Sequence, residues 1–326
     1  MTPLRCPQCR AVYAEPARFC TRDGAPLEAD EPEAELPGTV LDGRFHVEQR
    51  IGEGGMAAVY VAADAVSGGR VAIKVLAAHL SADKASVERF KREALIASRF
   101  SHPSVCPILQ LGATPAGLVY LVMPWLEGEA LHQRINRTGP LSLAEGLPLL
   151  VQVCRGLQHA HDLGVLHRDL KPENVMLIAD DTTPGGLRAV VMDFGLAMEL
   201  ARRPASPKLT AVGVVLGTPE FMSPEQIRGR ELDARSDIYS LGLLAFETFA
   251  GRLPFDGTSA QELQIARLRG QPTQLRTVRP DMPARLEAAL SRALAMDPGN
   301  RFPSMTAFGD ALEAVASARS SGEVQP

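Results

Sequence analysis

The sequence predicts an α+β protein with two lobes, a strand-rich lobe followed by a helical lobe, and a small cysteine-bearing segment in front of them. Alternating and short apolar runs typical of strands fill residues 45–126, and apolar residues at helical spacing follow residue 140. The acidic stretch EADEPEAELPG separates both patterns from three clustered cysteines and has the composition of a solvated linker. Because a groove between two lobes is a common ligand site, we expect the function to lie there.

These changes in composition divide the chain into regions. The strand-like patterns end near residue 125, and the last ten residues are polar and typical of a tail. The predicted regions are a cysteine segment over 1–27, a linker over 28–38, a first lobe over 39–125, a second lobe over 126–316 and a tail over 317–326.

The overall composition excludes several classes of protein. With 45% hydrophobic and 22% charged residues, the chain of 326 residues has the balance of a globular protein. A net charge of −4 argues against general nucleic-acid binding, which needs clustered cationic side chains. There is neither a membrane-length apolar run nor the apolar core of a secretory signal, so we expect a cytoplasmic protein. Cys106 and Cys154 stand alone in apolar surroundings and are expected to be core residues.

Strand patterns organise the first lobe. Phe45, Val47, Gln49 and Ile51 alternate with polar neighbours until GEGG interrupts them, which predicts a first strand. AAVYVA and VAIKVL predict two strands joined by a turn at SGG, and GLVYLVMPWL predicts another. Before this last strand, an apolar stripe at spacings of three and four predicts a helix; its members are Val87, Phe90, Ala94 and Ala97.

Two long helices are predicted in the second lobe. The stretch SLAEGLPLLVQVCRGLQHAHDLG begins with Ser142 and Glu145 at the spacing of a capping box. Pro148 is expected to deform its early turns, because proline lacks the amide hydrogen of a helical bond. SDIYSLGLLAFETFAG is apolar almost all round, which predicts a buried central helix.

Three features of the first lobe point to phosphate binding only when they are taken together. Gly52 and Gly54 in IGEGGMAAVY let backbone amides approach phosphate oxygens, although a plain hairpin turn explains them better in isolation. Lys74 in VAIKVL would need an anionic partner in a groove, and Glu93 on the predicted helix offers one. In isolation, each is better explained as an ordinary charge on an exposed face.

The stretch HRDLKPEN, residues 167–174, is far more specific. Its acid, bases and amide at fixed spacing would arise by chance in roughly one chain in a thousand of this length. Further along, VVMDFGLA places Asp193 between an apolar strand and a glycine. Acid, amide and acid on two adjacent loops supply the oxygen ligands that hard cations prefer, with room left for water and phosphate.

The motifs now resemble those of a bacterial, eukaryotic-like (Hanks-type) Ser/Thr protein kinase over about residues 40–315. The Gly-rich loop, VAIK, a helix glutamate, HRDLKPEN, DFG and SPE occur in the order of that family, and six matches in order are specific. The resemblance implies the two-lobed protein kinase fold. It also implies transfer of the γ-phosphoryl group of Mg-ATP to protein hydroxyls, including those of the chain's own activation segment.

The resemblance implies a role for each matching residue. Asp169 would accept the proton of the substrate hydroxyl, and Lys171 would steady the transferred phosphate. Lys74, paired with Glu93, would hold the α- and β-phosphates of ATP. The other residues implied to contact ATP are Ile51, Gly52, Glu53, Gly54, Gly55, Val59, Ala72, Met123, Pro124, Leu126, Glu127 and Met176.

Two further points follow from the comparison with the family pattern. Asn174 and Asp193 would bind Mg²⁺. The chain departs from the pattern at Ala57, which replaces the third glycine of the loop, and in a smaller way at Pro124, where many relatives carry glutamate. We expect the first change to alter the affinity for the nucleotide and not to abolish activity.

Residues 196–222 correspond to the activation segment of the family. Kinases with an arginine before the catalytic aspartate, here Arg168, are often activated when a phosphothreonine pairs with that arginine. Thr210 is the first candidate phosphosite, Ser206 the second and Thr218 the third. For Thr218, the favoured interpretation is a structural hydroxyl that contacts the catalytic residues. The implied structural anchors are Glu225, Arg301 and Asp237.

The N-terminal segment resembles a small zinc ribbon. Cys6 and Cys9 have the spacing of a zinc knuckle, and Cys20 with Asp23 would form the second half of a Zn²⁺ site. A segment this short cannot build a core, so it would need the metal to fold. The alternative is a metal-free remnant, and DNA binding by the segment is not expected.

Three functions are compatible with these motifs. The favoured one is an active kinase with protein substrates and a transient dimer for autophosphorylation. The second is a scaffold with a kinase fold that binds ATP and recruits partners through the N-terminal segment; an intact set of catalytic residues argues against it. The third is a small-molecule phosphotransferase, and the segment GTPEFMSPE, which forms a peptide platform in similar proteins, argues against that.

Overall fold

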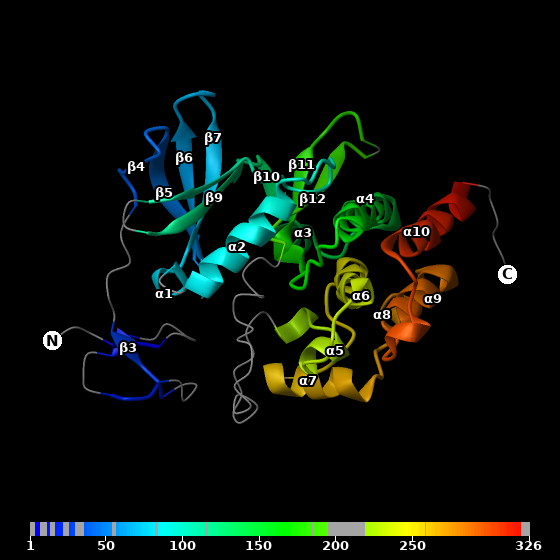
Figure 1. Ribbon diagram of the computed structural model, residues 1–326. Coiled ribbons are helices and arrows are strands. Elements are labelled where there is room, and N and C mark those ends of the chain that lie inside the picture. Colours follow the sequence, from blue (N-terminus) through cyan, green and yellow to red (C-terminus); the bar gives the residue numbers. More distant parts are fainter. Residues whose placement is uncertain are drawn as a thin grey trace. The chain divides into compact units, whose positions relative to one another are not determined.

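The computed structural model of the chain describes residues 4–6, 12–13, 17–21, 26–29, 36–53, 57–81, 84–114, 117–183, 185–194, 219–257 and 259–320. It divides into two compact units, one formed by Met1–Lys91 with Ile108–Trp125 and the other by Arg92–Pro107 with Leu126–Pro326. The first unit contains most of the strands and the second most of the helices (Figure 1). This is the α+β division that the sequence predicts.

The main sheet of the first unit has six antiparallel strands in the order β4-β5-β6-β7-β9-β8. Its strands are β4 (Val40–Leu41), β5 (Phe45–Glu53), β6 (Ala57–Asp64), β7 (Arg70–Leu76), β8 (Gln110–Ala113) and β9 (Val119–Pro124). Alternate side chains point to one face, where they form a buried core. The members of this core are Leu36, Leu41, Phe45, Val47, Ala58, Tyr60, Ala62, Val71, Ile73, Val75, Tyr120 and Val122. Leu36 belongs to it although it lies in the predicted linker.

The first long strand does not keep the alternation seen in its sequence. Phe45 and Val47 are buried, but Gln49 and Ile51 are exposed. β5 pairs with β6 through two register shifts, one after Val47 and one after Arg50. Each shift inserts an unpaired residue and turns the following side chains. The buried face of β5 therefore ends before the Gly-rich loop.

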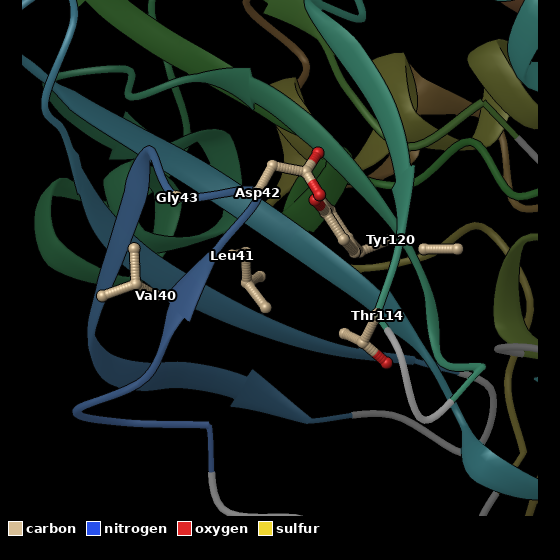
Figure 2. A pocket seen from close by; sticks show the side chains of 7 residues that line it. Val40, Leu41, Asp42, Gly43, Thr114 and Tyr120 are labelled. Atoms are coloured by element: carbon tan, nitrogen blue, oxygen red, sulfur yellow. The ribbon is translucent and has the colours of Figure 1, made fainter.

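The sheet curls so that β4 and the turn after it lie beside β8, the strand at the opposite edge. The Gln110 amide on β8 donates a hydrogen bond of 2.7 Å to the carboxylate of Asp42, in the turn after β4. In Figure 2, the Asp42 carboxylate and the Tyr120 hydroxyl point toward each other. The ring of Tyr120 crosses β8 at Gly112, where a Cβ atom would lie 2.2 Å from the ring. A pocket of about 400 Å³ lies where β4 and its turn approach β8. It is lined by Val40, Leu41, Asp42, Gly43, Ala113, Thr114 and Tyr120.

The predicted helix after β7 is present. A short helix α1 (Ala78–Ser81) precedes α2 (Lys84–Ala97). Phe90, Ala94 and Ala97 are buried on α2 and Val87 is half-buried, which confirms the apolar stripe.

The N-terminal segment contains three short strands, β1 (Leu4–Arg5), β2 (Val12–Tyr13) and β3 (Glu28–Ala29), in the order β2-β1-β3. Cys6 and Cys20 are buried together, with Tyr13 and Leu27 packed against them. The Tyr13 hydroxyl donates a hydrogen bond of 3.2 Å to the sulfur of Cys20. The other two predicted zinc ligands, Cys9 and Asp23, lie outside the described residues.

The second unit begins with a three-stranded sheet and two helices. The elements are β10 (Gly128–Ala130), α3 (Leu131–Thr138), α4 (Leu143–Asp162), the 3₁₀ turn η1 (Pro172–Asn174), β11 (Val175–Ala179) and β12 (Leu187–Val191). The predicted capping box is present, because Ser142 accepts from the Glu145 amide and the Glu145 side chain accepts from the Ser142 amide. Helix α4 continues through Pro148 without interruption. Cys106 and Cys154 are both buried, as expected, and burial raises the pKa of each thiol.

The second unit also contains α6 (Ala234–Ala250), which is buried along most of its length, as predicted, and several further helices and 3₁₀ turns. They are η2 (Pro219–Phe221), α5 (Pro224–Ile227), α7 (Ala260–Arg269), α8 (Leu275–Val278), α9 (Ala284–Ala293), η3 (Pro298–Asn300) and α10 (Met305–Ser320). α6 contacts α4, α8, α9 and α10. The buried Glu225 and Arg301 form a bidentate ion pair with distances of 2.7 and 2.9 Å, which confirms their interpretation as structural anchors.

Within the described ranges, the helices are all too short or too polar to cross a membrane. The last helix, α10, continues to Ser320, beyond the point where the sequence predicts a tail.

Candidate active site

The β11–β12 hairpin places two of the predicted site residues at the same end. β11 and β12 are antiparallel, and Val175 lies opposite Val191. Asn174 directly precedes β11, while Met192 and Asp193 directly follow β12. The Met192 amide donates a hydrogen bond of 2.8 Å to the Asn174 carbonyl. The prediction of an amide and an acid on adjacent loops is therefore confirmed.

Asp169 joins this end of the hairpin through Asn174. The Asn174 side-chain amide donates to the Asp169 carbonyl at 2.8 Å and lies 3.4 Å from the Asp169 carboxylate. Lys171 Nζ is 3.1 Å from the same carboxylate, and both side chains are partly exposed. Because the Asn174 nitrogen is engaged in this way, its side-chain oxygen is the atom left to bind a cation. The group combines a carboxylate, an ammonium and an amide oxygen.

Asp237, buried at the start of α6, holds the backbone in front of Asp169. Its carboxylate accepts hydrogen bonds from the amides of His167 and Arg168, at 2.8 and 2.9 Å. It also faces His161 Nε2 at 2.7 Å. Burial opposes ionisation of Asp237, but the hydrogen bond from His161 and the neighbouring charges keep its pKa below the usual value. The third predicted anchor is thus confirmed.

Arg168 and Asp193 both have positive φ angles, of 65° and 54°. A side chain other than glycine is strained in this region, so the surrounding contacts must hold it there. At Arg168 these contacts are the bond from its amide to Asp237 and a bond of 2.7 Å from the Gln226 side chain to its carbonyl. The strain lies in the two loops that carry the predicted catalytic aspartate and metal ligand.

The neutral imidazole of His167 connects the loop that carries Asp169 to the loop that carries Asp193. Its Nε2 donates to the Met192 carbonyl at 2.8 Å, and its Nδ1 accepts from the Asp169 amide at 3.3 Å. Burial lowers the pKa of His167, although the charge of Asp237 opposes this. Phe194 packs against the His167 ring on one side and against Phe100 on the other, with centroids 4.8 Å apart in both pairs. The tilted ring contacts hold Phe194, and the bond to the Met192 carbonyl holds the residue on the other side of Asp193.

In the first unit, the predicted nucleotide residues occupy one face of the sheet. Val59 lies opposite Lys74, and Ala72 lies opposite Met123. These residues are half-buried, while their neighbours Ala58, Ile73 and Val122 point into the core. Since alternate residues face opposite sides of a strand, the four side chains share the face away from the core.

The other predicted ATP-binding residues lie around these strands. Gly52 pairs with Val59 near the end of β5 and is half-buried, whereas Ile51 and Glu53 are exposed. Pro124 ends β9, Leu126 and Glu127 follow in the second unit, and Met176 is half-buried on β11. Ala57, the departure from the loop pattern, begins β6.

Some predicted residues cannot be placed. Gly54, Gly55, Ser206, Thr210 and Thr218 lie outside the described residues. Glu93 lies on α2, but its side chain is outside the described part of the chain, so its pairing with Lys74 stays a prediction.

Sequence reasoning missed two residues that shape the site. His161 on α4 binds Asp237, and only its spacing of six residues before His167 in the sequence could have hinted at this. Gln226 completes a capping box with Ser223 and also holds the Arg168 carbonyl. The sequence Ser-Pro-Glu-Gln has the spacing of a capping box, so it could have predicted that Gln226 caps the helix, but not that it binds the Arg168 carbonyl.

Comparison with known proteins agrees with the geometry. Residues 45–311 match the model of the family described as protein kinase domain. The chain is 39% identical over 284 residues to the serine/threonine-protein kinase pkn3 of Myxococcus xanthus, which covers 86% of this chain and 51% of the relative. It is 36% identical over 267 residues to PrkC of Bacillus subtilis, covering 82% of this chain and 40% of the relative.

A solved structure is also similar. The crystal structure of the PknI kinase domain of Mycobacterium tuberculosis matches with a TM-score of 0.66 and 30% identity, covering 86% of this chain and 99% of that domain. The chain spans about half the length of pkn3 and less of PrkC.

Proposed function

Since the chain belongs to the protein kinase family and carries a Ser/Thr protein kinase domain, we propose that it transfers the γ-phosphoryl group of Mg-ATP to Ser and Thr hydroxyls of proteins. One observation carries the proposal. Asp169, Lys171 and Asn174 contact one another at the end of the β11–β12 hairpin that also bears Asp193. The proposal includes the chain's own activation segment among the substrates. It also places the enzyme in the cytoplasm, where ATP is available as the donor.

The proposed reaction assigns the proton transfer to Asp169. As the oxygen of the substrate hydroxyl bonds to the γ-phosphorus, the bond from that phosphorus to the β–γ bridging oxygen breaks and ADP leaves. The hydroxyl proton passes to the Asp169 carboxylate. Lys171, 3.1 Å from this carboxylate, brings positive charge next to the transferred group. Positioning and electrostatic stabilisation then supply most of the rate enhancement.

Asn174 and Asp193 are the proposed ligands of Mg²⁺, which supplies positive charge to the phosphate oxygens when bound. The donors fit this ion, because a carboxylate and an amide oxygen are the hard ligands that Mg²⁺ prefers. The engagement of the Asn174 nitrogen by Asp169 supports this assignment, because it orients the side-chain oxygen away from that residue.

The nucleotide is proposed to lie against the half-buried face of Val59, Ala72, Lys74 and Met123. Lys74, paired with Glu93, would hold the α- and β-phosphates. The backbone of the Gly-rich loop would cover the phosphates.

A transfer assay tests the proposed function. Purified chain is incubated with Mg²⁺ and radiolabelled ATP, with and without histone as the acceptor. Wild type should label itself and the histone, whereas Asp169→Asn should lose at least about a thousandfold in rate while keeping its ATP affinity, because it loses the proton acceptor only. If ATP binds to the wild type, but neither protein is labelled even after Thr210→Glu, the scaffold alternative is favoured.

Regulation is proposed to depend on phosphorylation of the activation segment. Thr210 is the first candidate and Ser206 the second, and a phosphate there would pair with Arg168. Phosphorylation between two copies would require a transient dimer. Mapping of phosphosites on autophosphorylated protein tests this order.

We also propose that Cys6, Cys9, Cys20 and Asp23 bind one Zn²⁺. The burial of Cys6 beside Cys20 supports the proposal, as does the hydrogen bond from Tyr13 to the Cys20 sulfur, which suits a thiolate acceptor. Elemental analysis of the purified chain should find about one zinc per molecule, and Cys6→Ser should lose it. Absence of zinc in the wild type would favour the metal-free alternative.

A further inference from the structure

Arg267 on α7 is the largest of the fully buried side chains, with 1% of its surface exposed. Arginine is seldom buried to this extent without a carboxylate partner. Among the residues that the structure describes, no carboxylate forms an ion pair with Arg267. Burial lowers the pKa of its guanidinium, and Tyr239 and Glu220 oppose this effect.

The guanidinium is held by two carbonyl groups instead. Its Nε donates to the Leu263 carbonyl in its own helix at 3.1 Å. Its Nη1 donates to the carbonyl of Met222, 45 residues away, at 3.2 Å. The third nitrogen, Nη2, is buried and has no hydrogen-bond partner among the described residues.

These contacts are poor for stability. A buried charge without an ion pair and with an unused donor is unfavourable, and an apolar side chain of similar length would fill the same space without that penalty. An apolar side chain could reproduce neither carbonyl bond, and of the two only the bond to Met222 reaches outside α7. A function specific to Arg267 therefore lies in its hold on the Met222 carbonyl.

Met222 lies in a segment that is tied to the catalytic loop. One residue before it, the Phe221 carbonyl accepts a bond of 2.8 Å from Ser240 in the buried helix α6. Four residues after it, Gln226 donates to the carbonyl of Arg168, the residue before Asp169. Residues 221–226 are therefore held next to the segment that carries Asp169.

We propose that Arg267 is a positioning residue for the protein substrate. By holding the Met222 carbonyl from α7, it sets the path of the backbone over residues 221–226, against which the chain flanking the acceptor hydroxyl lies. Ser240 and Arg267 hold the first two residues of this segment, and Gln226 at its end binds the Arg168 carbonyl. The inference rests on the proposed function, because it assigns a role toward the same substrate.

Kinetics on matched variants test the inference. Arg267→Met keeps the length but removes the donor, Arg267→Lys keeps one donor, and Arg269→Met is the control, because Arg269 is exposed on the same helix. With histone as the acceptor, Arg267→Met should raise KM for histone about tenfold, with kcat and KM for ATP changed less than about twofold. Arg267→Lys should recover part of the loss, and Arg269→Met should behave as wild type.

Hydrogen exchange gives a readout that does not depend on turnover. In Arg267→Met, the amides of residues 219–226 should exchange faster than in wild type, while those of α6 should not change. An unchanged KM for histone, an equal rise in both KM values, or unchanged exchange over 219–226 overturns the inference. If the methionine variant does not fold, the lysine variant decides by the same criteria. A wild type that transfers no phosphate contradicts the proposed function, and the exchange data then still decide the role of Arg267.

Discussion

Asp237 shows how a single buried residue stabilises a site that it does not enter. Its carboxylate satisfies the amides of His167 and Arg168 and the ring of His161. Two of these donors belong to the segment just before Asp169, so the position of the proposed proton acceptor depends on them. The strained φ of Arg168 persists because Asp237 and Gln226 hold the peptide groups on its two sides.

We predict that Asp237→Asn lowers the free energy of unfolding by about 2–4 kcal/mol. The amide would retain one acceptor oxygen but would place an NH₂ group against a donor that Asp237 now satisfies. Urea unfolding at pH 7 measures the change. Asp310→Asn, at an exposed position of α10, serves as the control and should change stability by less than about 0.5 kcal/mol. Equal effects of the two variants would contradict the assigned role.

At the residue scale, the sequence predicted that an amide and an acid lie on two adjacent loops, and Asn174 and Asp193 do so. Asn174 and Asp193 come together because the two strands between them form a hairpin, of which the sequence analysis predicted only the apolar strand before Asp193. The partners of His161 and Arg267 could not be predicted, because they lie 76 and 45 residues away and no motif links them.

At the scale of elements, the curled sheet shows what periodicity can and cannot predict. Its long strands follow from alternation and short apolar runs, and α2 and α4 follow from apolar spacing. The register shifts in β5 and the contact between the edge strands depend on pairing partners, which alternation in one strand does not reveal. Leu36 enters the core for the same reason, since its partners are distant in sequence.

Gly112 on β8 is predicted to be indispensable to the curl. A Cβ atom at this position would lie 2.2 Å from the Tyr120 ring, so Gly112→Ala must displace the ring or the strand. We expect a loss of about 1–3 kcal/mol in the free energy of unfolding.

A double-mutant cycle with Tyr120→Leu checks this cause. The smaller side chain should relieve the clash, so the cost of the alanine should fall in the Tyr120→Leu background. Gly69→Ala is the control, since its Cβ would meet its nearest atom at an ordinary distance of 3.7 Å. Additive effects of Gly112→Ala and Tyr120→Leu would show that the ring is not the cause.

At the scale of the whole molecule, buried titratable groups set the response of stability to pH. His167 has a lowered pKa in the folded state. Its contribution to stability is therefore present above pH 6.5, the usual histidine pKa, and is lost as the pH falls through the folded-state pKa. Asp237 and Glu225 also have lowered pKa values, and their contribution is lost at still lower pH. Glu247 acts in the opposite direction: burial raises its pKa to about 7, with Glu173 and Glu220 adding to the effect.

The raised pKa of Glu247 leads to a prediction about how stability changes with pH. A carboxyl group with a raised pKa stabilises the folded state below about pH 4.5. This stabilisation is lost as the pH rises through about 7. Glu247→Gln should therefore be more stable than wild type by about 1–3 kcal/mol at pH 8, and the difference should vanish near pH 4. Thermal or urea unfolding at both pH values measures it, with the exposed Glu231→Gln as the control. A stabilisation that does not depend on pH would contradict the explanation.

The meeting of β4 and β8 has a consequence for the behaviour of the protein at high concentration. The outermost strands of an open sheet offer unsatisfied peptide groups to which a strand of another molecule can add, and this is a common start of aggregation. Here these two strands are only two and four residues long and are turned toward each other, with Asp42 and Gln110 bonded across the gap. Cutting that bond with Gln110→Leu should leave folded molecules that assemble more readily on storage.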